Sequence, residues 1–145
     1  MDRNEFLVLD YEFSRFSYRW TDLSVYFCEL ISNHFDFENE IDFNHYPNEE
    51  KRKYFINIYL NELKINFEQF DVKMDNECSL LFETDFGSMF IMFERMLFML
   101  THHSFELNET ENLQIAKCQL QVYLYLKDAF KHKYNFYALL NDIDK

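Results

Sequence analysis

The sequence predicts a mainly α-helical chain that carries one short β-strand near its N-terminus. Apolar residues recur at three- and four-residue steps through most of the 145 residues, which is the spacing of one face of an α-helix. Helix-start signals at Pro47 and Asn108 separate these periodic segments. Residues 6–9 form an apolar run whose length suits a buried strand better than a helix. We therefore expect four main helices and a short fifth one to build the core.

The first elements along the chain are the strand and two helices. The strand is residues 6–9, Phe-Leu-Val-Leu. An apolar stripe then predicts a helix that begins at Asp22, its expected N-cap, and runs to about Phe35. The second helix begins after Pro47, at Asn48. The residues expected to face the core are Leu23, Tyr26, Phe27, Leu30 and Ile31 in the first helix, and Tyr54, Phe55, Ile58, Tyr59 and Leu63 in the second.

Two longer helices follow. Residues 81–100 have helical spacing throughout and predict a central core helix. Asn108 and Glu111 form a capping box that starts the next helix, and Phe136 and Leu139 fall in a short last one. The residues expected in the core are Leu81, Phe82, Phe86, Met89, Phe90, Phe93, Met96, Leu97 and Leu100 of the central helix, and Leu113, Ala116, Leu120, Tyr123, Leu124 and Phe130 of the next.

The composition excludes several classes of function. A single glycine cannot supply a Walker A loop, a dinucleotide-binding fingerprint or a glycine-rich lid over ATP. Fourteen Lys and Arg against 26 Asp and Glu give a net charge of −12, which repels a phosphate backbone and an anionic membrane surface. We therefore expect neither a nucleic-acid nor a membrane partner.

Nothing in the sequence indicates export, a membrane span or a second domain. The apolar run at residues 6–9 is too short for a signal peptide or a membrane span. Cys28, Cys78 and Cys118 lack the spacing of a disulfide framework or a zinc site, and we expect them to be small apolar fillers. We predict a single domain over residues 1–145 and a cytoplasmic location.

Two carboxylates at the end of the strand are the first candidates for chemistry. Asp10 and Glu12 are two residues apart, so a strand would place them on one face. Mg²⁺ takes one or two carboxylates together with substrate phosphate oxygens. The pair therefore suits a magnesium site, although the same pattern also occurs in solvated turns.

A wider set of residues resembles the choline and ethanolamine kinases, which have the protein-kinase-like fold of the aminoglycoside phosphotransferases. The resemblance is strong over residues 7–29 and thin afterwards. It implies that the chain is the helical C-terminal subdomain of that α+β fold. The residues that carry it are Val8-Leu9-Asp10-Tyr11-Glu12-Phe13-Ser14, Tyr18-Arg19, Asp22-Leu23, Phe27-Cys28-Glu29 and, further on, Tyr46-Pro47.

The resemblance also implies roles for individual residues. Asp10, with Glu12 beside it, would bind the Mg²⁺ that bridges the ATP phosphates, and Asp22 would order the catalytic loop. Glu29 would face the amino alcohol and offset its ammonium charge. Read without the resemblance, Asp22 is an N-cap and Glu29 lies at the edge of an apolar stripe. The resemblance places four more residues at or near the amino-alcohol site: Phe13, His34, Glu106 and Leu107.

The sequence departs from the family at the aromatic box that surrounds the cationic head. Met92 and Arg95 stand at the positions of two tryptophans, and Asn112 stands at that of a tyrosine. An arginine there would repel a cation, and the loss of aromatic faces favours the smaller primary amine, ethanolamine, over choline. Residues 18–20, Tyr-Arg-Trp, could belong to a pocket or form a surface aromatic and cationic cluster.

Phosphoryl transfer needs groups that this sequence does not contain. The phosphate loop, a strand lysine, a catalytic Asp and a metal-binding Asn precede the metal-binding Asp in this fold, whereas nine residues precede Asp10. We therefore expect these 145 residues alone to be inactive, and a full-length form to transfer the γ-phosphoryl group of ATP to ethanolamine or choline. The alternative is a non-catalytic helical remnant that binds a protein partner. An unpaired strand at residues 6–9 would also favour homo- or hetero-oligomers through its edge.

Overall fold

The computed structural model describes residues 17–31, 41–101 and 108–135. This part of the chain is helical and contains no strand, so the mainly α prediction is confirmed. The strand expected at residues 6–9 and the short helix expected after Asn135 lie outside the described residues. The elements are α1 (Trp20–Glu29), the short 3-10 helix η2 (Phe43–His45), α2 (Glu49–Asn66), α3 (Glu77–Thr101) and α4 (Glu109–Tyr134).

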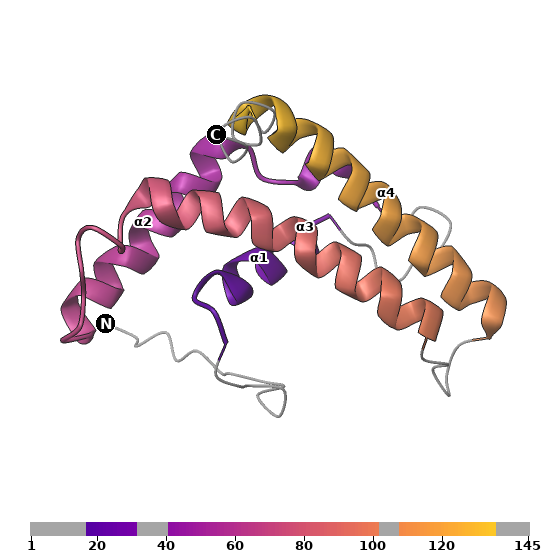
Figure 1. The fold of residues 1–145 in the computed structure, drawn as a ribbon, viewed down its shortest axis with the longest axis horizontal. Helices are drawn as coiled ribbons and strands as arrows, with labels where there is room; N and C mark the ends of the chain where they lie inside the picture. Colours follow the sequence, from indigo (N-terminus) through magenta and orange to yellow (C-terminus); the bar gives the residue numbers. More distant parts are fainter. Residues whose placement is uncertain (1–16, 32–40, 102–107, 136–145) are drawn as a thin grey trace, which may run out of the picture.

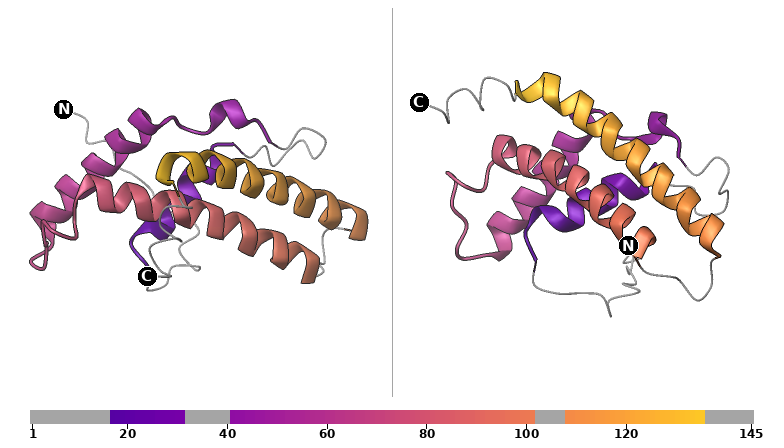
Figure 2. Two further views of the ribbon diagram at one scale, coloured as in Figure 1. Left: turned by 45° about the horizontal axis from the view of Figure 1, so that its top comes forward. Right: turned by 45° about the vertical axis from the view of Figure 1, so that its right-hand side comes forward.

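The long helix α3 is the centre of the arrangement. It packs against α1, α2 and α4 (Figure 1). Figure 2 shows α4 running alongside α3 in the opposite direction, while α2 crosses the first half of α3. As predicted, the segment over residues 81–100 is the central helix.

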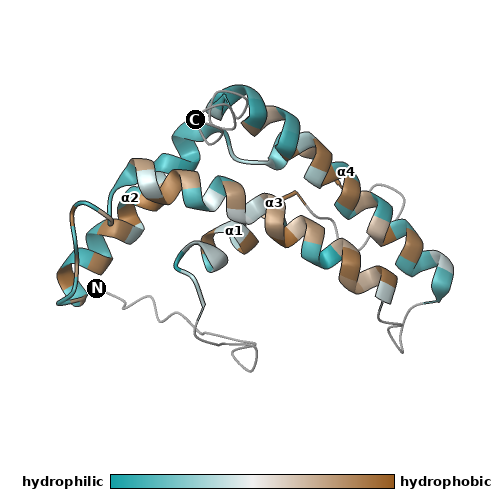
Figure 3. Cartoon of the chain, viewed as in Figure 1, coloured by the Kyte–Doolittle hydropathy of each residue, from teal (hydrophilic) through white to brown (hydrophobic). Residues whose placement is uncertain are grey.

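Two buried apolar clusters hold these helices together, one at each end of α1. The first joins α1, α3 and α4, and the second joins α1, α2 and α3. Figure 3 shows apolar residues along both helices of the α3 and α4 pair. The first cluster is Cys28, Ile31, Ile91, Met92, Val122, Leu126 and Phe130, and the second is Leu23, Ile56, Leu60, Leu80 and Leu81.

The helix starts at Asn48 and Asn108 are confirmed. The Asn48 side chain accepts a hydrogen bond from the backbone N–H of Lys51 at 3.0 Å. Asn108 and Glu111 bond to each other's backbone N–H groups at 3.0 and 2.8 Å, which is a complete capping box. Local side-chain chemistry therefore sets both starts, because it satisfies backbone donors that the helix leaves free.

The predicted limits of the first helix are wrong. α1 starts at Trp20, its N-cap is Arg19 without a side-chain cap bond, and its last residue is Glu29. Arg19 instead binds across to α3, where its Nε and Nη2 donate to Glu83 at 2.8 and 2.5 Å, and it also pairs with Asp75. These contacts anchor the start of α1 and replace the expected cap.

A close approach between α1 and α3 explains the one glycine. A Cβ at Gly87 would overlap the Trp20 ring and would lie 2.5 Å from Oγ of Ser24. The Ser24 hydroxyl donates to the carbonyl oxygen of Thr84 at 3.0 Å across the same contact. The backbones can therefore approach this closely only because residue 87 lacks a side chain.

The predicted core faces of all four described α-helices are partly wrong. In α2 the buried residues are Arg52, Ile56 and Leu60, while Tyr54, Phe55 and Ile58 are exposed. In α3 small and polar residues face inward, and several of the expected phenylalanines lie on the surface. These helices carry apolar side chains on more than one face, so periodicity does not select the buried one. The other exposed residues that we expected in the core are Tyr26 and Leu30 of the first helix, Phe82, Phe90, Phe93, Leu97 and Leu100 of α3, and Leu113, Leu120 and Leu124 of α4.

The three cysteines are free thiols. Cys28 and Cys118 are buried, as expected for apolar fillers, but Cys78 is exposed, so that expectation is wrong for Cys78. Burial raises the pKa of the Cys28 thiol to about 12. This thiol therefore stays protonated near neutral pH and is not a nucleophile.

Candidate functional site

Two of the predicted site residues lie in the part of the chain that the structure describes. These are Asp22 and Glu29, both on α1. The structure does not test the remaining candidates, which stay predictions. The residues that lie outside the described ranges are Asp10, Glu12, Phe13, His34, Glu106 and Leu107.

Asp22 is an exposed residue in the first turn of α1. It is not the N-cap that we expected, because the helix begins two residues earlier. A carboxylate in the first turn still interacts favourably with the positive end of the helix dipole. The position of Asp22 is therefore compatible with a purely local role.

Glu29 forms an ion pair with Arg95. Nη2 of Arg95, from the second half of α3, donates to Oε1 of Glu29 at the end of α1. The two side chains are 30% and 36% exposed, so the pair lies at the edge of the core beside the buried Cys28. An arginine thus contacts the same carboxylate that the resemblance assigns to the ammonium of an amino alcohol.

The other two positions of the expected aromatic box are buried. Met92 belongs to the apolar cluster between α1, α3 and α4. The side-chain amide of Asn112, near the start of α4, is buried and has no hydrogen-bond partner among the described residues. Neither side chain offers an aromatic face to a cation.

A second polar centre, which the sequence did not predict, lies where α2, α3 and α4 meet. Asp85 of α3 is fully buried. Its Oδ2 accepts hydrogen bonds from Nζ of Lys133 at 2.8 Å and from the Tyr134 hydroxyl at 2.7 Å, both on α4. Nε of Arg52 lies 3.1 Å from Oδ1 of Asp85, at an angle that makes an ion pair without a hydrogen bond. We call these four residues the Asp85 cluster.

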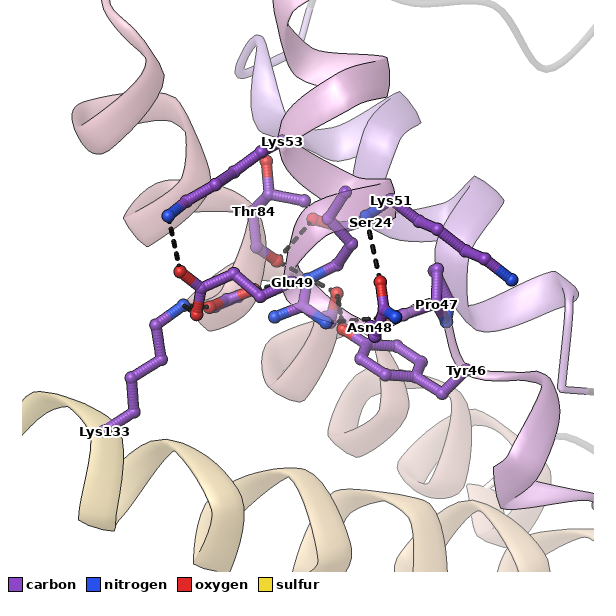
Figure 4. Close-up of polar contacts among 12 residues, drawn as sticks. Ser24, Tyr46, Pro47, Asn48, Glu49, Lys51, Lys53, Thr84 and Lys133 are labelled. Atoms are coloured by element: carbon purple, nitrogen blue, oxygen red, sulfur yellow. Dashed lines mark hydrogen bonds and ion pairs between the residues drawn. The ribbon is translucent and has the colours of Figure 1, made fainter.

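The surroundings of Arg52 match its charge and shape. Its Nη1 donates to the carbonyl oxygen of Pro47 at 2.5 Å. The guanidinium carbon lies 5.1 Å from the Tyr46 ring centroid and 5.9 Å from that of Phe130, within the range of cation–π attraction. Figure 4 shows how Tyr46, Pro47 and Asn48 lead into α2 at this junction. The contacts connect the start of α2 to the end of α4.

Glu49 forms the solvent-exposed rim of the cluster. Lys53 and Lys133 reach it from two helices, with N–O distances of 2.6 and 2.9 Å (Figure 4). Hydrogen bonds from Lys53 and then Lys133 lower the pKa of the Glu49 carboxyl to about 2. The ionised form is therefore favoured in the folded chain.

This pKa shift predicts a small loss of stability in acid. A carboxyl whose pKa falls on folding stabilises the fold above its unfolded pKa and loses that contribution as the pH drops toward the folded value. We expect Glu49→Gln to be less stable than the parent chain at pH 7 by under about 1 kcal/mol, because the side chain is 42% exposed. Urea unfolding at pH 7, 4 and 2.5 should show this difference shrinking between about pH 4.5 and 2. A difference that is constant across this range would contradict the assignment.

Comparison with known proteins agrees with the resemblance in the first thirty residues and extends it. The family model for choline/ethanolamine kinase matches residues 1–124. The chain belongs to this family. A protein described as probable choline kinase 1 of Arabidopsis thaliana is 38% identical over 58 residues, which is 39% of this chain and 17% of that protein. No solved structure gives a significant match.

The family match makes the ion pair between Glu29 and Arg95 relevant to substrate binding. The choline/ethanolamine kinase model covers both Glu29 and Arg95. The sequence alone indicated that an arginine at position 95 opposes a cation, but the two residues are 66 positions apart and nothing in the sequence joins them. The structure shows that the positive charge is directed at the one described carboxylate that the resemblance assigns to the amino alcohol.

Within the described ranges, no three His, Cys, Asp or Glu side chains gather closely enough to hold a metal ion. The predicted magnesium ligands Asp10 and Glu12 are outside those ranges. The described helices also include none that is long and apolar enough to cross a membrane. The magnesium assignment in this family member therefore depends on the sequence of residues 7–14.

Proposed function

We propose that this chain is the C-terminal helical part of a kinase that transfers the γ-phosphoryl group of ATP to ethanolamine or choline. The observation that supports this most directly is the family match over residues 1–124, a range that includes Asp10 and Glu12. Asp10 and Glu12 would hold the Mg²⁺ that bridges the ATP phosphates and neutralises their charge. The matched segment spans 17% of the Arabidopsis relative, so the remaining groups of the reaction would come from sequence beyond these 145 residues.

The natural polypeptide that contains these residues provides the test. Immunopurified from its own cells and supplied with Mg²⁺ and labelled ATP, it should form phosphoethanolamine or phosphocholine. Asp10→Asn should lower the initial rate at least about a hundredfold, because a bridging metal contributes several kcal/mol to the transition state. Asp128→Asn is the matched control, since Asp128 is exposed on α4 and, among the described residues, forms an ion pair only with His132, at 3.8 Å.

The purified 145-residue chain should form no product under the same conditions, because it contains one glycine and none of the upstream catalytic motifs. If this chain formed product and Asp10→Asn abolished it, the proposal that the other catalytic groups come from sequence beyond these 145 residues would be contradicted. A folded natural polypeptide without transferase activity would contradict the kinase proposal itself.

The ion pair between Arg95 and Glu29 favours a second candidate, a non-catalytic helical remnant that binds a protein partner. A carboxylate already neutralised by an arginine offers less to a cationic substrate. The two candidates differ in one result, because only the first requires phosphoryl transfer that depends on Asp10. The cytoplasmic location and the oligomers expected through residues 6–9 stay predictions under both.

A further inference from the structure

A row of phenylalanines on α3 lies at the surface of the molecule. Its members follow one another at steps of four, four and three residues, so they share one side of the helix: Phe82, Phe86, Phe90 and Phe93. We call these four residues the phenylalanine row. Phe82, Phe90 and Phe93 are 41%, 58% and 41% exposed, and Phe86 is partly buried. An apolar face with this spacing is typical of a helix that packs against another apolar element.

A groove of about 270 Å³ lies where the phenylalanine row meets α4. The Phe93 and Tyr123 rings, one from each helix, have centroids 5.7 Å apart. The groove is smaller than the roughly 300–1,000 Å³ typical of sites for small molecules. It therefore suits the apolar side chains of a packed segment better than a polar ligand. Its lining carries no charged side chain and consists of Phe86, Met89, Phe90, Phe93 and Tyr123.

The helix α4 ends at one end of this row. The Tyr134 ring meets Phe82 edge-on with centroids 5.1 Å apart, and its centroid lies 6.1 Å from that of Phe86. The next residue, Asn135, ends α4 in the left-handed conformation, with φ 49° and ψ 52°. This conformation is a common helix stop and turns the chain away from the helix axis. Because α4 runs antiparallel to α3, a chain that turns back here follows α3 toward Phe93 (Figure 2).

The ten residues after Asn135 have the sequence pattern of a short amphipathic helix. Four apolar residues stand at positions i, i+3, i+4 and i+7, which is one face of a helix. A helix of ten residues is about 15 Å long, and the row from Phe82 to Phe93 spans about 16 Å. The segment therefore has the length and the apolar face to cover the row. The four apolar residues are Phe136, Leu139, Leu140 and Ile143.

We propose that residues 136–145 form a short helix that turns back from α4 and packs on the phenylalanine row, with its four apolar residues facing α3. The segment is joined directly to the end of α4, so closing this contact costs little chain entropy. A hairpin that turns at Asn135 brings Asp144 close to Lys127 of α4. The ammonium of Lys127 lies 5.9 Å from the Tyr123 ring centroid, at the groove. This charge pair favours the antiparallel direction.

A second copy of the chain is a weaker candidate for this surface. Each copy carries a net charge of −12, so two copies repel each other before any apolar contact forms. The proposed contact also does not depend on the proposed kinase activity. Residues 136–145 lie beyond the family match, which ends at residue 124. Loss of phosphoryl transfer would leave this contact in place, and loss of the contact would leave the kinase proposal untouched.

Hydrogen–deuterium exchange of residues 136–145 provides the test, because the amides of a packed helix exchange only when the helix opens. In the 145-residue chain these amides should exchange at least about fivefold more slowly than in a synthetic peptide of the same ten residues. The difference should be the same at low and high protein concentration, since the contact lies within one chain.

Four variants identify the two surfaces of the contact. Leu140→Glu should reduce the protection to less than about twofold, because it places a charge against the phenylalanine row, and Phe90→Glu should do the same from the α3 side. Ala138→Glu adds the same charge to the opposite side of the expected helix and should leave the protection unchanged. Leu113→Glu, at an exposed position near the start of α4, is the second control.

Circular dichroism establishes that each variant is folded. Four results would each overturn the proposal. These are exchange as fast as in the free peptide, equal losses of protection in Ala138→Glu and Leu140→Glu, protection that Phe90→Glu leaves unchanged, and protection that rises with protein concentration. The last result would assign the phenylalanine row to a second copy of the chain.

Discussion

Asp85→Ala should lower the free energy of unfolding by about 3–5 kcal/mol, because it leaves Arg52 charged and buried without an acid partner. Arg52 is 5% exposed and Asp85 is completely buried. The variant also removes the acceptor of the Lys133 and Tyr134 hydrogen bonds. Lys133 can turn toward solvent and Glu49, but the Arg52 guanidinium is buried and cannot reach solvent in the same way. Urea unfolding followed by circular dichroism measures the effect.

The matched control is Asp128→Ala, which removes an exposed carboxylate from α4 and should change stability by under about 0.5 kcal/mol. The double variant Asp85→Leu with Arg52→Met should be more stable than Asp85→Ala, since exchanging both members of a buried ion pair for apolar side chains avoids the uncompensated charge. An Asp85→Ala chain as stable as the parent would show that Arg52 is hydrated and that the Asp85 cluster contributes nothing.

The starts of two helices could be predicted because they depend on residues close together in sequence. Asn48 binds a backbone N–H three residues later, and Asn108 exchanges bonds with Glu111 over the same separation. Such signals are complete within one turn. The same local reasoning failed at Asp22, because Arg19 anchors the start of α1 through acids 56 and 64 residues away.

The buried faces could not be predicted, because large apolar side chains surround these helices. In α3 the large Phe82, Phe90 and Phe93 are exposed, while Gly87 and Ser88 are buried, since the backbone of α1 approaches too closely for a larger side chain at position 87. Hydrophobic periodicity ranks faces by apolar content and contains no information about the distance to the neighbouring helix.

In the candidate site, too, individual residues could be predicted from the sequence but the contacts between them could not. The resemblance selected Glu29, and it also marked Arg95 as unfavourable for a cation. Their pairing follows from the packing of α1 on α3 and could not be derived from either residue alone. The Asp85 cluster was missed for the same reason, since Asp85 lies 33 positions from Arg52 and 48 from Lys133 in the sequence.

A chain that ends at Lys127 should lose its cooperative unfolding transition, although it retains every residue that matches the family model. The match ends at residue 124, whereas Phe130, Lys133 and Tyr134 lie beyond it in the last turns of α4. Their loss removes a buried aromatic side chain, worth about 3–5 kcal/mol, and both hydrogen-bond donors to Asp85. Together these losses rival the total stability of a domain, which is about 5–15 kcal/mol.

The control chain ends at Asn135 and keeps every described contact of the Asp85 cluster. It should unfold in one transition, so comparing the two chains isolates the residues after Lys127. Removing these residues has an effect larger than any single substitution, because Asp85 loses its two donors and Arg52 loses the Phe130 ring at once. Arg52 keeps its hydrogen bond to the Pro47 carbonyl and its contact with the Tyr46 ring, but among the described contacts Asp85 keeps only the ion pair with Arg52, at 3.1 Å and without a hydrogen bond. Equal urea midpoints for the two chains would show that the packing of α3 against the first part of α4 suffices, and that the Asp85 cluster adds no stability to the fold.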